Sequence, residues 1–242
     1  MKQVKPYKNK PGDKKAQVKE MFDNISPKYD FLNRLLSMGI DRGWRNKLID
    51  LMKPYQPKNI LDIATGTGDL AILEAIQLSP EKVIGLDISE GMLKVAKEKV
   101  LEKKLEHIIE LITGDAENIP YENDTFDAIT VAFGVRNFEN LKQGLKEMNR
   151  VLKPGGIALI LEFSQPEQTP FKQAYGIYSK YILPFIGKII SGDQSAYSYL
   201  PESISVFPYG EKMKQILMES GFSQVNIYPL TFGISTIYLA KK

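Results

Sequence analysis

The spacing of apolar residues changes after the first fifty-seven positions of the chain. From about Val18 to Met52, apolar side chains recur every three or four residues, which is the spacing of helices that bury one face. Pro54 and Pro57 end this helical region. Short apolar runs follow at residues 59–63, 83–86, 108–112, 126–132 and 156–163.

Helical stretches separate these runs, at residues 69–78, 90–104 and 141–152. Strands that alternate with helices predict a parallel sheet covered on both faces. A last helical stretch at 211–220 precedes two more apolar runs, at 224–228 and 235–240. We therefore predict an α/β fold of the Rossmann-like, doubly wound type: a mostly parallel, seven-stranded sheet with helices on both faces and an N-terminal helical cover.

Composition excludes several kinds of catalytic site. The chain has 242 residues, no Cys and one His, His107. Without Cys, no disulfide, thiolate zinc site or Cys nucleophile can form, and one His cannot make a multi-His metal site. We therefore expect no metal site. His107 precedes the third strand, at the edge opposite Asp87 and Asp115, so we expect it to lie outside any pocket formed by those residues.

Basic residues gather at the N-terminus. Residues 1–20 carry seven Lys against Asp13 and Glu20, whereas the formal net charge of the whole chain is only +3. The remainder is slightly acidic, which argues against nucleic acid as a partner. Two interpretations of the basic segment stay open: a solvated flexible extension, or an electrostatic tether to anionic lipid. No apolar run approaches the ~18 residues of a spanning helix and no signal peptide is evident, so we expect a cytoplasmic protein.

The first predicted strand runs into a glycine-rich loop, in which Gly66 and Gly68 flank Thr67. A Gly-x-Gly turn between a strand and a helix lets a ligand approach backbone amides closely. A dinucleotide loop would have a third Gly and an uncharged helix start, because pyrophosphate binds there. Here Asp69 begins the helix. We expect its carboxylate to attract a cation such as S-adenosylmethionine and to repel pyrophosphate. Asp69 therefore argues against a nicotinamide-dependent oxidoreductase.

Acidic residues also end the second and third predicted strands. Asp87 lies 19 residues after Gly68, where a carboxylate can accept both hydroxyls of a ribose. Asp87 could instead cap the following helix, although Ser89 is better placed to do so. Asp115 and Ala116 suit an adenine edge, because a carboxylate accepts from the exocyclic amine and a backbone amide donates to the ring. The carboxyl ends of parallel strands meet at one edge, so these residues should share a pocket.

Together these features resemble class I S-adenosylmethionine-dependent methyltransferases. Over residues 18–242 the resemblance narrows to the menaquinone/ubiquinone C-methyltransferase family (UbiE/MenG). The segments that carry it are YDFLN at 29–33, FGVRN at 133–137, RVLKPGGIALILEFS at 150–164 and YLPES at 199–203. Three positions depart from the family pattern: Ala132 stands where a Ser is frequent, Asp41 where a His is usual, and Leu32 where a Met is usual.

The resemblance implies a site for S-adenosylmethionine, with S-adenosylhomocysteine as the product and no metal. The cofactor-binding residues that we expect are Asp62, Gly66, Thr67, Gly68, Asp87, Asp115 and Ala116. The resemblance also implies that Tyr29 and Asn33 lie on the substrate side and that Arg136 and Asn137 are catalytic. Without it, Arg136 and Asn137 would be interpreted as residues that cap the fourth strand and bind backbone.

The reaction that the resemblance implies is methyl transfer to a ring carbon of a polyprenylated quinol, from 2-demethylmenaquinol to menaquinol. The motifs fit the benzoquinol of the ubiquinone pathway equally well, and another small-molecule acceptor is a further alternative. The resemblance leaves open a peripheral contact with the inner face of the membrane and a homodimer.

We divide the chain into a basic flexible tail at 1–16 and a single methyltransferase domain at 17–242. The parts expected within the domain are an N-terminal helical cap at 17–57, a cofactor-binding half at 58–164, a substrate-side insertion at 165–209, and a C-terminal helix with strands at 210–242. The apolar stretch 171–190 suggests a helical cover packed on the core, or a wall for a polyprenyl tail.

Overall fold

A computed structural model describes residues 4–7, 10–177 and 194–242 of the chain. It contains a seven-stranded sheet with the strand order β3-β2-β1-β4-β5-β7-β6. The strands are β1 Asn59–Ile63, β2 Lys82–Asp87, β3 Ile109–Thr113, β4 Phe126–Ala132, β5 Leu152–Phe163, β6 Gln224–Leu230 and β7 Ser235–Lys241. The predicted fold class is confirmed, and β1 and β4 have the predicted bounds.

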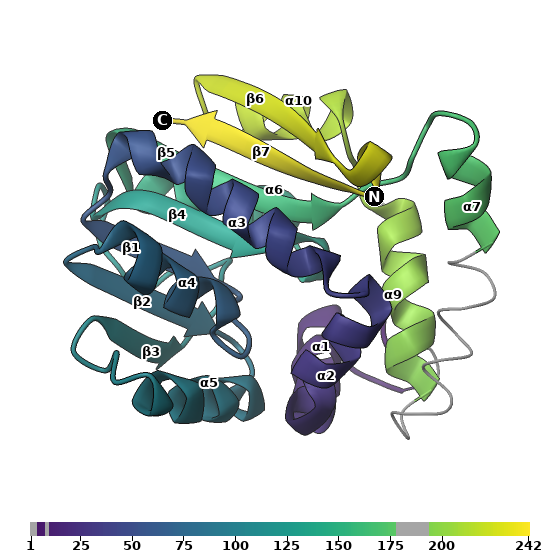
Figure 1. The fold of residues 1–242 in the computed structure, drawn as a ribbon, viewed down its shortest axis with the longest axis horizontal. Helices are drawn as coiled ribbons and strands as arrows, with labels where there is room; N and C mark the ends of the chain where they lie inside the picture. The colour runs from purple at the N-terminus through teal and green to yellow at the C-terminus, as the bar shows by residue number, and fades with distance from the viewer. Residues whose placement is uncertain (1–3, 8–9, 178–193) are drawn as a thin grey trace.

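Helices flank the sheet on both faces and cover one of its ends (Figure 1). They are α1 Lys14–Ile25, α2 Tyr29–Ser37, α3 Ile40–Met52, α4 Asp69–Leu78, α5 Glu90–Glu102, α6 Leu141–Val151, α7 Phe171–Ile177, α9 Gln194–Val206 and α10 Glu211–Glu219. Short 3-10 turns are η1 Ser26–Lys28, η2 Lys53–Tyr55, η3 Val135–Asn137 and η5 Thr231–Gly233.

The strand order reverses direction between β1 and β4. From β1 the chain continues outward through β2 to β3, and from β4 it continues in the opposite direction through β5. The five strands β1 to β5 are parallel, whereas β7 pairs antiparallel with both β5 and β6. A reversal of this kind leaves a crevice beyond the carboxyl ends of the central strands, where open α/β sheets bind their ligands.

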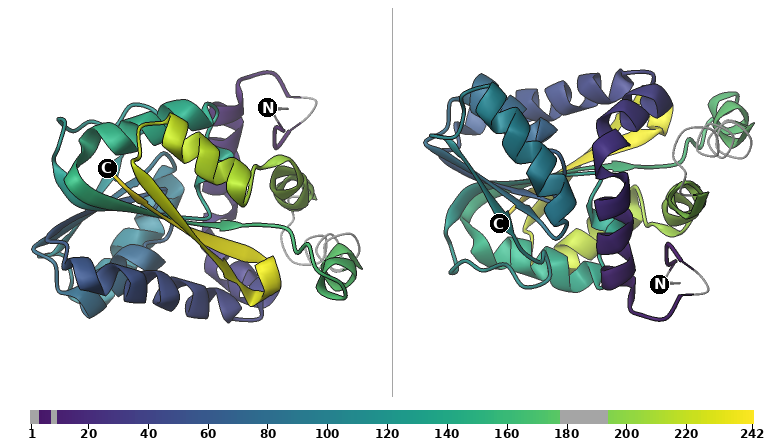
Figure 2. Two further views of the ribbon diagram at one scale, coloured as in Figure 1. Left: turned by 90° about the horizontal axis from the view of Figure 1, so that it is seen from above. Right: turned by 90° about the horizontal axis from the view of Figure 1, so that it is seen from below.

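Two apolar cores lie on the two faces of the sheet. Along β5, Ile157 and Leu159 pack into one core, which also holds α3 and α4, whereas Ala158 and Ile160 pack into the other, with α6 and α10. The alternation follows from the two-residue period of a strand. Figure 2 shows the helices on opposite sides of the sheet in both perpendicular views. The sheet is therefore a rigid base for its loops.

The N-terminal segment differs from the flexible tail predicted for residues 1–16. Helix α1 begins at Lys14, capped by the side chain of Asp13, and Pro6 is buried. The backbone amide of Tyr7 donates to the side chain of Gln17 at 3.0 Å. Part of the predicted tail is thus a piece of the helical cover.

The segment 178–193 lies outside the described residues, and with it most of the apolar stretch 171–190. The flanking parts of the insertion are α7 and α9, which lie beyond the carboxyl ends of the strands, on the same side as α1 and α2 (Figure 1). His107 is exposed in the turn before β3, as predicted.

Candidate active site

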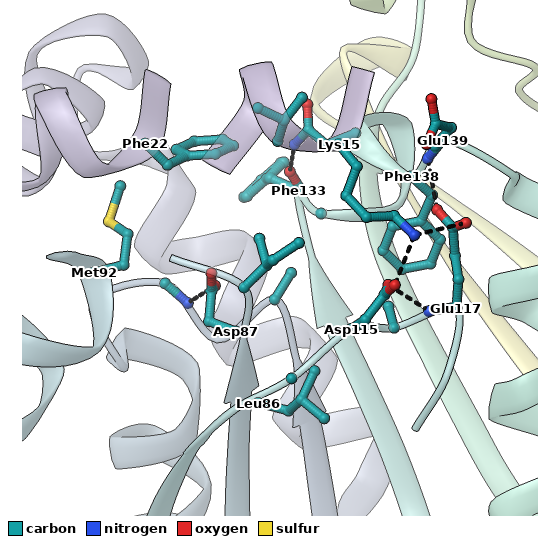
Figure 3. A pocket seen from close by; sticks show the side chains of 18 of the residues that line it. Lys15, Phe22, Leu86, Asp87, Met92, Asp115, Glu117, Phe133, Phe138 and Glu139 are labelled. Carbon is teal, nitrogen blue, oxygen red and sulfur yellow. Dashed lines mark hydrogen bonds and ion pairs between the residues drawn. The ribbon is translucent and has the colours of Figure 1, made fainter. Parts of the chain in front are cut away.

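A pocket lies between α1 and the carboxyl ends of β1 to β4. Its lining residues come from α1 and α2, from the loops after these strands, and from η3. They are Lys15, Val18, Phe22, Tyr29, Ala64, Gly66, Leu86, Asp87, Ile88, Met92, Gly114, Asp115, Ala116, Glu117, Ala132, Phe133, Gly134, Asn137, Phe138 and Glu139. Figure 3 shows Phe22 and Lys15 on the α1 side, opposite Asp87 and Asp115 on the sheet side.

Asp62 supports the glycine-rich loop from below rather than lining the pocket. Its carboxylate accepts the hydroxyl of Thr65 at 2.6 Å and that of Thr130 at 3.1 Å, and the residue is 1% exposed. Burial raises the pKa of Asp62 to about 7. Within this loop, Gly66 and Gly68 have φ of 58° and 79°, in the left-handed region that favours glycine. The predicted cofactor residue Asp62 thus acts here through the shape of the loop.

Thr67 and Asp69 contact protein groups, not the pocket. The Thr67 hydroxyl donates to Asp30 of α2 at 2.5 Å. Lys99 of α5 pairs with both Asp30 and Asp69. Burial tends to raise the pKa of Asp69, but the charge and hydrogen bond of Lys99 outweigh it and lower that pKa. Asp69 therefore already has a cationic partner and is not among the residues that line the pocket, and the expectation that it attracts a cationic ligand stays a prediction.

Asp87 is held at the pocket by backbone amides. Its carboxylate accepts from the amides of Gly66 and Ser89, each at 2.8 Å. Burial raises its pKa to about 6, although these hydrogen bonds act in the opposite direction. Ser89 supplies the side-chain cap of α5, as predicted, so Asp87 is not needed for that purpose. Its carboxylate therefore remains available to a ligand at the end of β2.

Asp115 meets a lysine from the helical cover. One of its oxygens lies 2.6 Å from Lys15 Nζ of α1, and the other accepts the amide of Glu117 at 2.9 Å. Lys15 also lies 3.3 Å from Glu117 (Figure 3). An ammonium thus spans two carboxylates at the predicted adenine end of the pocket. The predicted residues Asp115 and Ala116 do line it.

Tyr29 lines the pocket from the start of α2, and Asn33 lies one turn further along the same helix. Burial raises the pKa of the Tyr29 phenol, against the hydrogen bond of Asn33 and the charges of Arg136 and Arg45, which lower it. Tyr29 is thus on the pocket wall, whereas Asn33 supports Tyr29 from outside the lining.

Arg136 and Asn137 belong to η3, directly after β4. The Arg136 guanidinium pairs with Glu162 of β5 at 2.8 Å and donates to the carbonyl of Phe133. Asn137 lines the pocket, and Tyr199 of α9 donates to its Oδ1 at 3.2 Å. The alternative interpretation, in which Arg136 binds backbone at the end of the fourth strand, therefore describes one of its contacts, the bond to the Phe133 carbonyl. Among the described residues no acceptor meets the buried Nε of Arg136.

One wall of the pocket, formed by α1, is not among the predicted site residues. Lys15, Val18 and Phe22 line it from α1, with the i, i+3, i+7 spacing of one helix face. That spacing could have identified the wall, but the basic composition of the segment suggested a solvated tail. Met92 and Phe138 were also missed, because nothing in their local pattern separates a pocket residue from a core residue.

The residues of the pocket fit a nucleoside. Asp87 and Asp115 can accept from ribose hydroxyls and an exocyclic amine, and Phe22, Leu86 and Met92 offer apolar surface to a flat ring. A Cβ on Gly114 would lie 2.9 Å from the side chain of Leu86. A side chain at position 114 would therefore require the end of the Leu86 side chain to move.

Comparison with known proteins shows which family the chain belongs to. The family model described as the ubiE/COQ5 methyltransferase family matches residues 10–242. The chain belongs to this family. Its members are S-adenosylmethionine-dependent methyltransferases, and the match includes α1 as well as the sheet.

Similar proteins come from several bacteria. The chain is 54% identical to a demethylmenaquinone methyltransferase of Bacteroides fragilis, with 99% of this chain and 97% of that protein covered. It is 44% identical to a ubiquinone/menaquinone biosynthesis C-methyltransferase of Geobacter sulfurreducens, over 95% of this chain and 90% of that protein.

Solved structures resemble the fold at low sequence identity. The [4+2]-cyclase SpnF has a TM-score of 0.70 at 18% identity, covering 96% of this chain and 98% of its own. An S-adenosyl-L-methionine-dependent methyltransferase of Methanococcus maripaludis has a TM-score of 0.61 at 22% identity, covering 98% and 96%. These likenesses show the fold alone. Within the described residues, no helix has both the length and the apolar character needed to cross a bilayer.

Proposed function

We propose that the protein methylates a ring carbon of a polyprenylated quinol, 2-demethylmenaquinol, with S-adenosylmethionine as the methyl donor. The observation that carries this proposal is the family match over residues 10–242, together with a relative of 54% identity whose name states that reaction. The pocket adds a physical argument, since it joins two carboxylates suited to a nucleoside with an aromatic and amide wall from η3.

Asp87 and Asp115 would hold the nucleoside end of the methyl donor, with the backbone of Ala116 at the adenine edge. Asp87 is preorganised by two backbone amides, so it need not reorient when a ribose binds. Bound S-adenosylmethionine supplies an electrophilic methyl group on a sulfonium. Thr67, Gly68 and Asp62 contribute by fixing the loop that holds Gly66 at the pocket.

A carbon nucleophile must become electron-rich, and loss of a phenolic proton achieves this. A phenol pKa of about 10 leaves roughly one part in a thousand ionised at pH 7, so stabilising the phenolate is worth up to about 4 kcal/mol. We assign this stabilisation to the charge of Arg136. The same charge acts on the phenols nearby: it lowers the pKa of Tyr29 and of Tyr199, although burial outweighs it at both.

Asn137 would bind a quinol oxygen, or a water that accepts its proton, because its side chain faces the pocket and it neighbours Arg136. Tyr29 would pack against the quinol ring from the opposite wall. Arg136 itself pairs with Glu162, so we assign it an electrostatic role and not that of a proton acceptor.

The reaction is tested by supplying methyl-labelled S-adenosylmethionine with a demethylmenaquinol and, separately, with the benzoquinol of the ubiquinone pathway. We expect label in the naphthoquinol product, at a kcat/KM at least about tenfold above that for the benzoquinol, which corresponds to ~1.4 kcal/mol. Product should depend on reduction of the quinone, because only the quinol has a phenolic proton to lose. Labelling of neither quinol, with S-adenosylhomocysteine still bound, would point to another acceptor on the same fold.

We also propose a peripheral contact with the membrane, where a polyprenylated quinol resides. Its support is a group of exposed apolar side chains at the carboxyl-end edge of the sheet, including Met38 (77% exposed) before α3 and Phe232 (66% exposed) before β7. Arg34 and Arg42 are exposed in the same region as Met38. The tail itself offers fewer free charges than its composition suggests, because Lys15 is paired with acidic groups.

Co-sedimentation with phosphatidylglycerol vesicles tests this contact. The double variant M38S/F232S is expected to lose at least about tenfold of the bound fraction, since each buried apolar side chain contributes about 1.5–3 kcal/mol. The control is L101S: Leu101 is 52% exposed on the last turns of α5, at the opposite edge of the sheet. If the unaltered protein does not sediment, or if L101S loses as much binding as the double variant, the contact is not at this edge.

A further inference from the structure

The turn η3 carries Asn137 to the pocket and is anchored to β5 through Arg136, whose guanidinium pairs with Glu162 at 2.8 Å and whose amide donates to it at 3.3 Å, but these contacts do not reach the Asn137 side chain. Within it, the amide of Asn137 donates to Gly134 at 2.9 Å and that of Phe138 to Val135 at 3.2 Å. The Asn137 side chain donates to the Phe133 carbonyl at 3.4 Å, which is long for a hydrogen bond. A turn of three residues with such bonds cannot fix an amide side chain by itself.

Two covering helices hold this turn from different sides. From α1, Lys14 donates to the carbonyls of Arg136 at 2.9 Å and Phe138 at 2.7 Å. From α9, the hydroxyl of Tyr199 donates to Oδ1 of Asn137 at 3.2 Å. Both side chains are buried, Lys14 at 7% and Tyr199 at 3% exposure. The contacts on η3 are therefore shielded from competing water.

The Tyr199 contact fixes the orientation of the Asn137 amide. A carboxamide has an accepting oxygen and a donating nitrogen, and only the oxygen can accept a hydrogen bond from a phenol. Burial raises the pKa of Tyr199 to about 12, against the lowering effect of Arg136, so the phenol keeps its proton at neutral pH. With Oδ1 held by Tyr199 and Nδ2 directed to Phe133, the amide has one orientation in preference to its flipped form.

We infer that Tyr199 is a positioning residue for the methyl transfer, since its hydroxyl fixes the Asn137 amide for the quinol oxygen while Lys14 holds the backbone of the same turn. This inference rests on the proposed function, in which Asn137 binds that oxygen. It gives the insertion a role beyond covering the pocket: α9 arranges the acceptor side of the site. Neither Tyr199 nor Lys14 lines the pocket, so neither should affect binding of the methyl donor directly.

The test is Tyr199→Phe, which removes one hydroxyl and keeps the ring. Tyr238→Phe is the matched control: Tyr238 is 1% exposed, burial also raises its pKa to about 12, and its hydroxyl accepts the Gly210 amide away from the pocket. We expect Y199F to lower kcat about tenfold, the loss of one buried hydrogen bond, with Kd for S-adenosylhomocysteine within twofold of the unaltered protein. Y238F should leave kcat within twofold.

A double-variant cycle shows whether Tyr199 acts through Asn137. If it does, adding Y199F to Asn137→Ala produces no further loss of kcat. Independent losses that multiply would overturn the inference, as would a Y199F enzyme with unchanged kcat. A failure of the proposed function can be told apart from a failure of this inference. If Asn137 does not bind the quinol oxygen, N137A alone would leave kcat unchanged.

Lys14→Met provides a second variant that acts on the same turn. It should lower kcat at least about fivefold without weakening the binding of S-adenosylhomocysteine, because the carbonyl of Arg136 in η3 and that of Phe138 directly after it lose their donor. Lys10→Met is its control, since Lys10 pairs with Glu20 at the protein surface. Equal losses in K14M and K10M, or a loss of cofactor affinity that parallels kcat in K14M, would contradict the role.

Discussion

Replacing Arg136 by alanine is expected to slow methyl transfer at least about a thousandfold, the upper range for removal of one charge-stabilising group from an active site. Binding of S-adenosylhomocysteine should remain nearly unchanged, because Arg136 is not among the residues that line the pocket. Single-turnover rates and calorimetry on the same preparation measure the two quantities. A fall in cofactor affinity as large as the fall in rate would contradict the electrostatic role.

The control for this variant must separate the effect of the Arg136 charge on methyl transfer from its effect on the stability of the fold. R136A leaves the carboxylate of Glu162 buried without its partner, which typically costs about 3–5 kcal/mol of unfolding free energy. The double variant R136A/E162Q removes both charges. We expect it to recover most of the stability and none of the turnover. If turnover returns together with stability, the guanidinium is structural.

Replacing Glu74 by glutamine is expected to stabilise the protein at pH 8 by about 1–3 kcal/mol, the usual range for one buried, unsatisfied polar group. Glu74 lies on α4 and is fully buried, and among the described residues its carboxyl oxygens have no hydrogen-bond partner. Burial, and then the charge of Asp62, raise its pKa well above the usual range. Glutamine has the shape of the protonated acid and cannot ionise.

The sign of the pH dependence follows from these shifts. Asp62 and Glu74 both hold protons more tightly in the folded chain than in the unfolded one, so folding takes up protons. The contribution of Asp62 to stability is complete below about pH 4 and is lost as pH rises through about 7, and the contribution of Glu74 is lost in the same direction. The other charges that act on Asp62 are Arg45, which lowers its pKa, and Asp87, which raises it.

Urea unfolding at pH 5 and pH 8 measures the effect. E74Q and the unaltered protein should have similar stability at pH 5 and differ at pH 8. The control is E81Q: Glu81 forms an exposed pair with Lys58, and such a pair contributes about 0–1 kcal/mol at either pH. An E74Q protein that is less stable at both values would show that the ionised carboxylate is needed.

Local pattern was enough to predict most of the sheet. The bounds predicted for β1 and β4 agree with the structure to the residue. The start of β5 was placed four residues late, since Pro154, Gly155 and Gly156 indicate a turn whereas the strand already begins at Leu152. Pro and Gly near a strand end are weak signals of where pairing starts.

The pairing of charges could not be predicted from the same pattern. Asp69 meets Lys99, thirty positions away, and Arg136 meets Glu162 on the neighbouring strand. Such pairs depend on which helix packs against which loop, and that is a property of the whole fold. For the same reason neither interpretation of the basic segment, a solvated extension or a lipid tether, places Lys15 on Asp115, where the structure has it. The sequence identifies Asp87 and Asp115 of the pocket but not Glu117, Glu139 or the lysine that pairs with Asp115.

Because the strand order reverses between β1 and β4, the two sides of the crevice are built by different parts of the chain. One side is built by β1, β2 and β3 and carries Asp87 and Asp115; the other is built by β4 and β5 and carries Asn137. The methyl donor and the methyl acceptor would therefore meet between two parts of the sheet that are separate in the chain. Substitutions on the β4 side, in the turn or in α9, can alter the preferred acceptor while the donor half stays intact, so acceptor range can diverge without loss of the methyl donor.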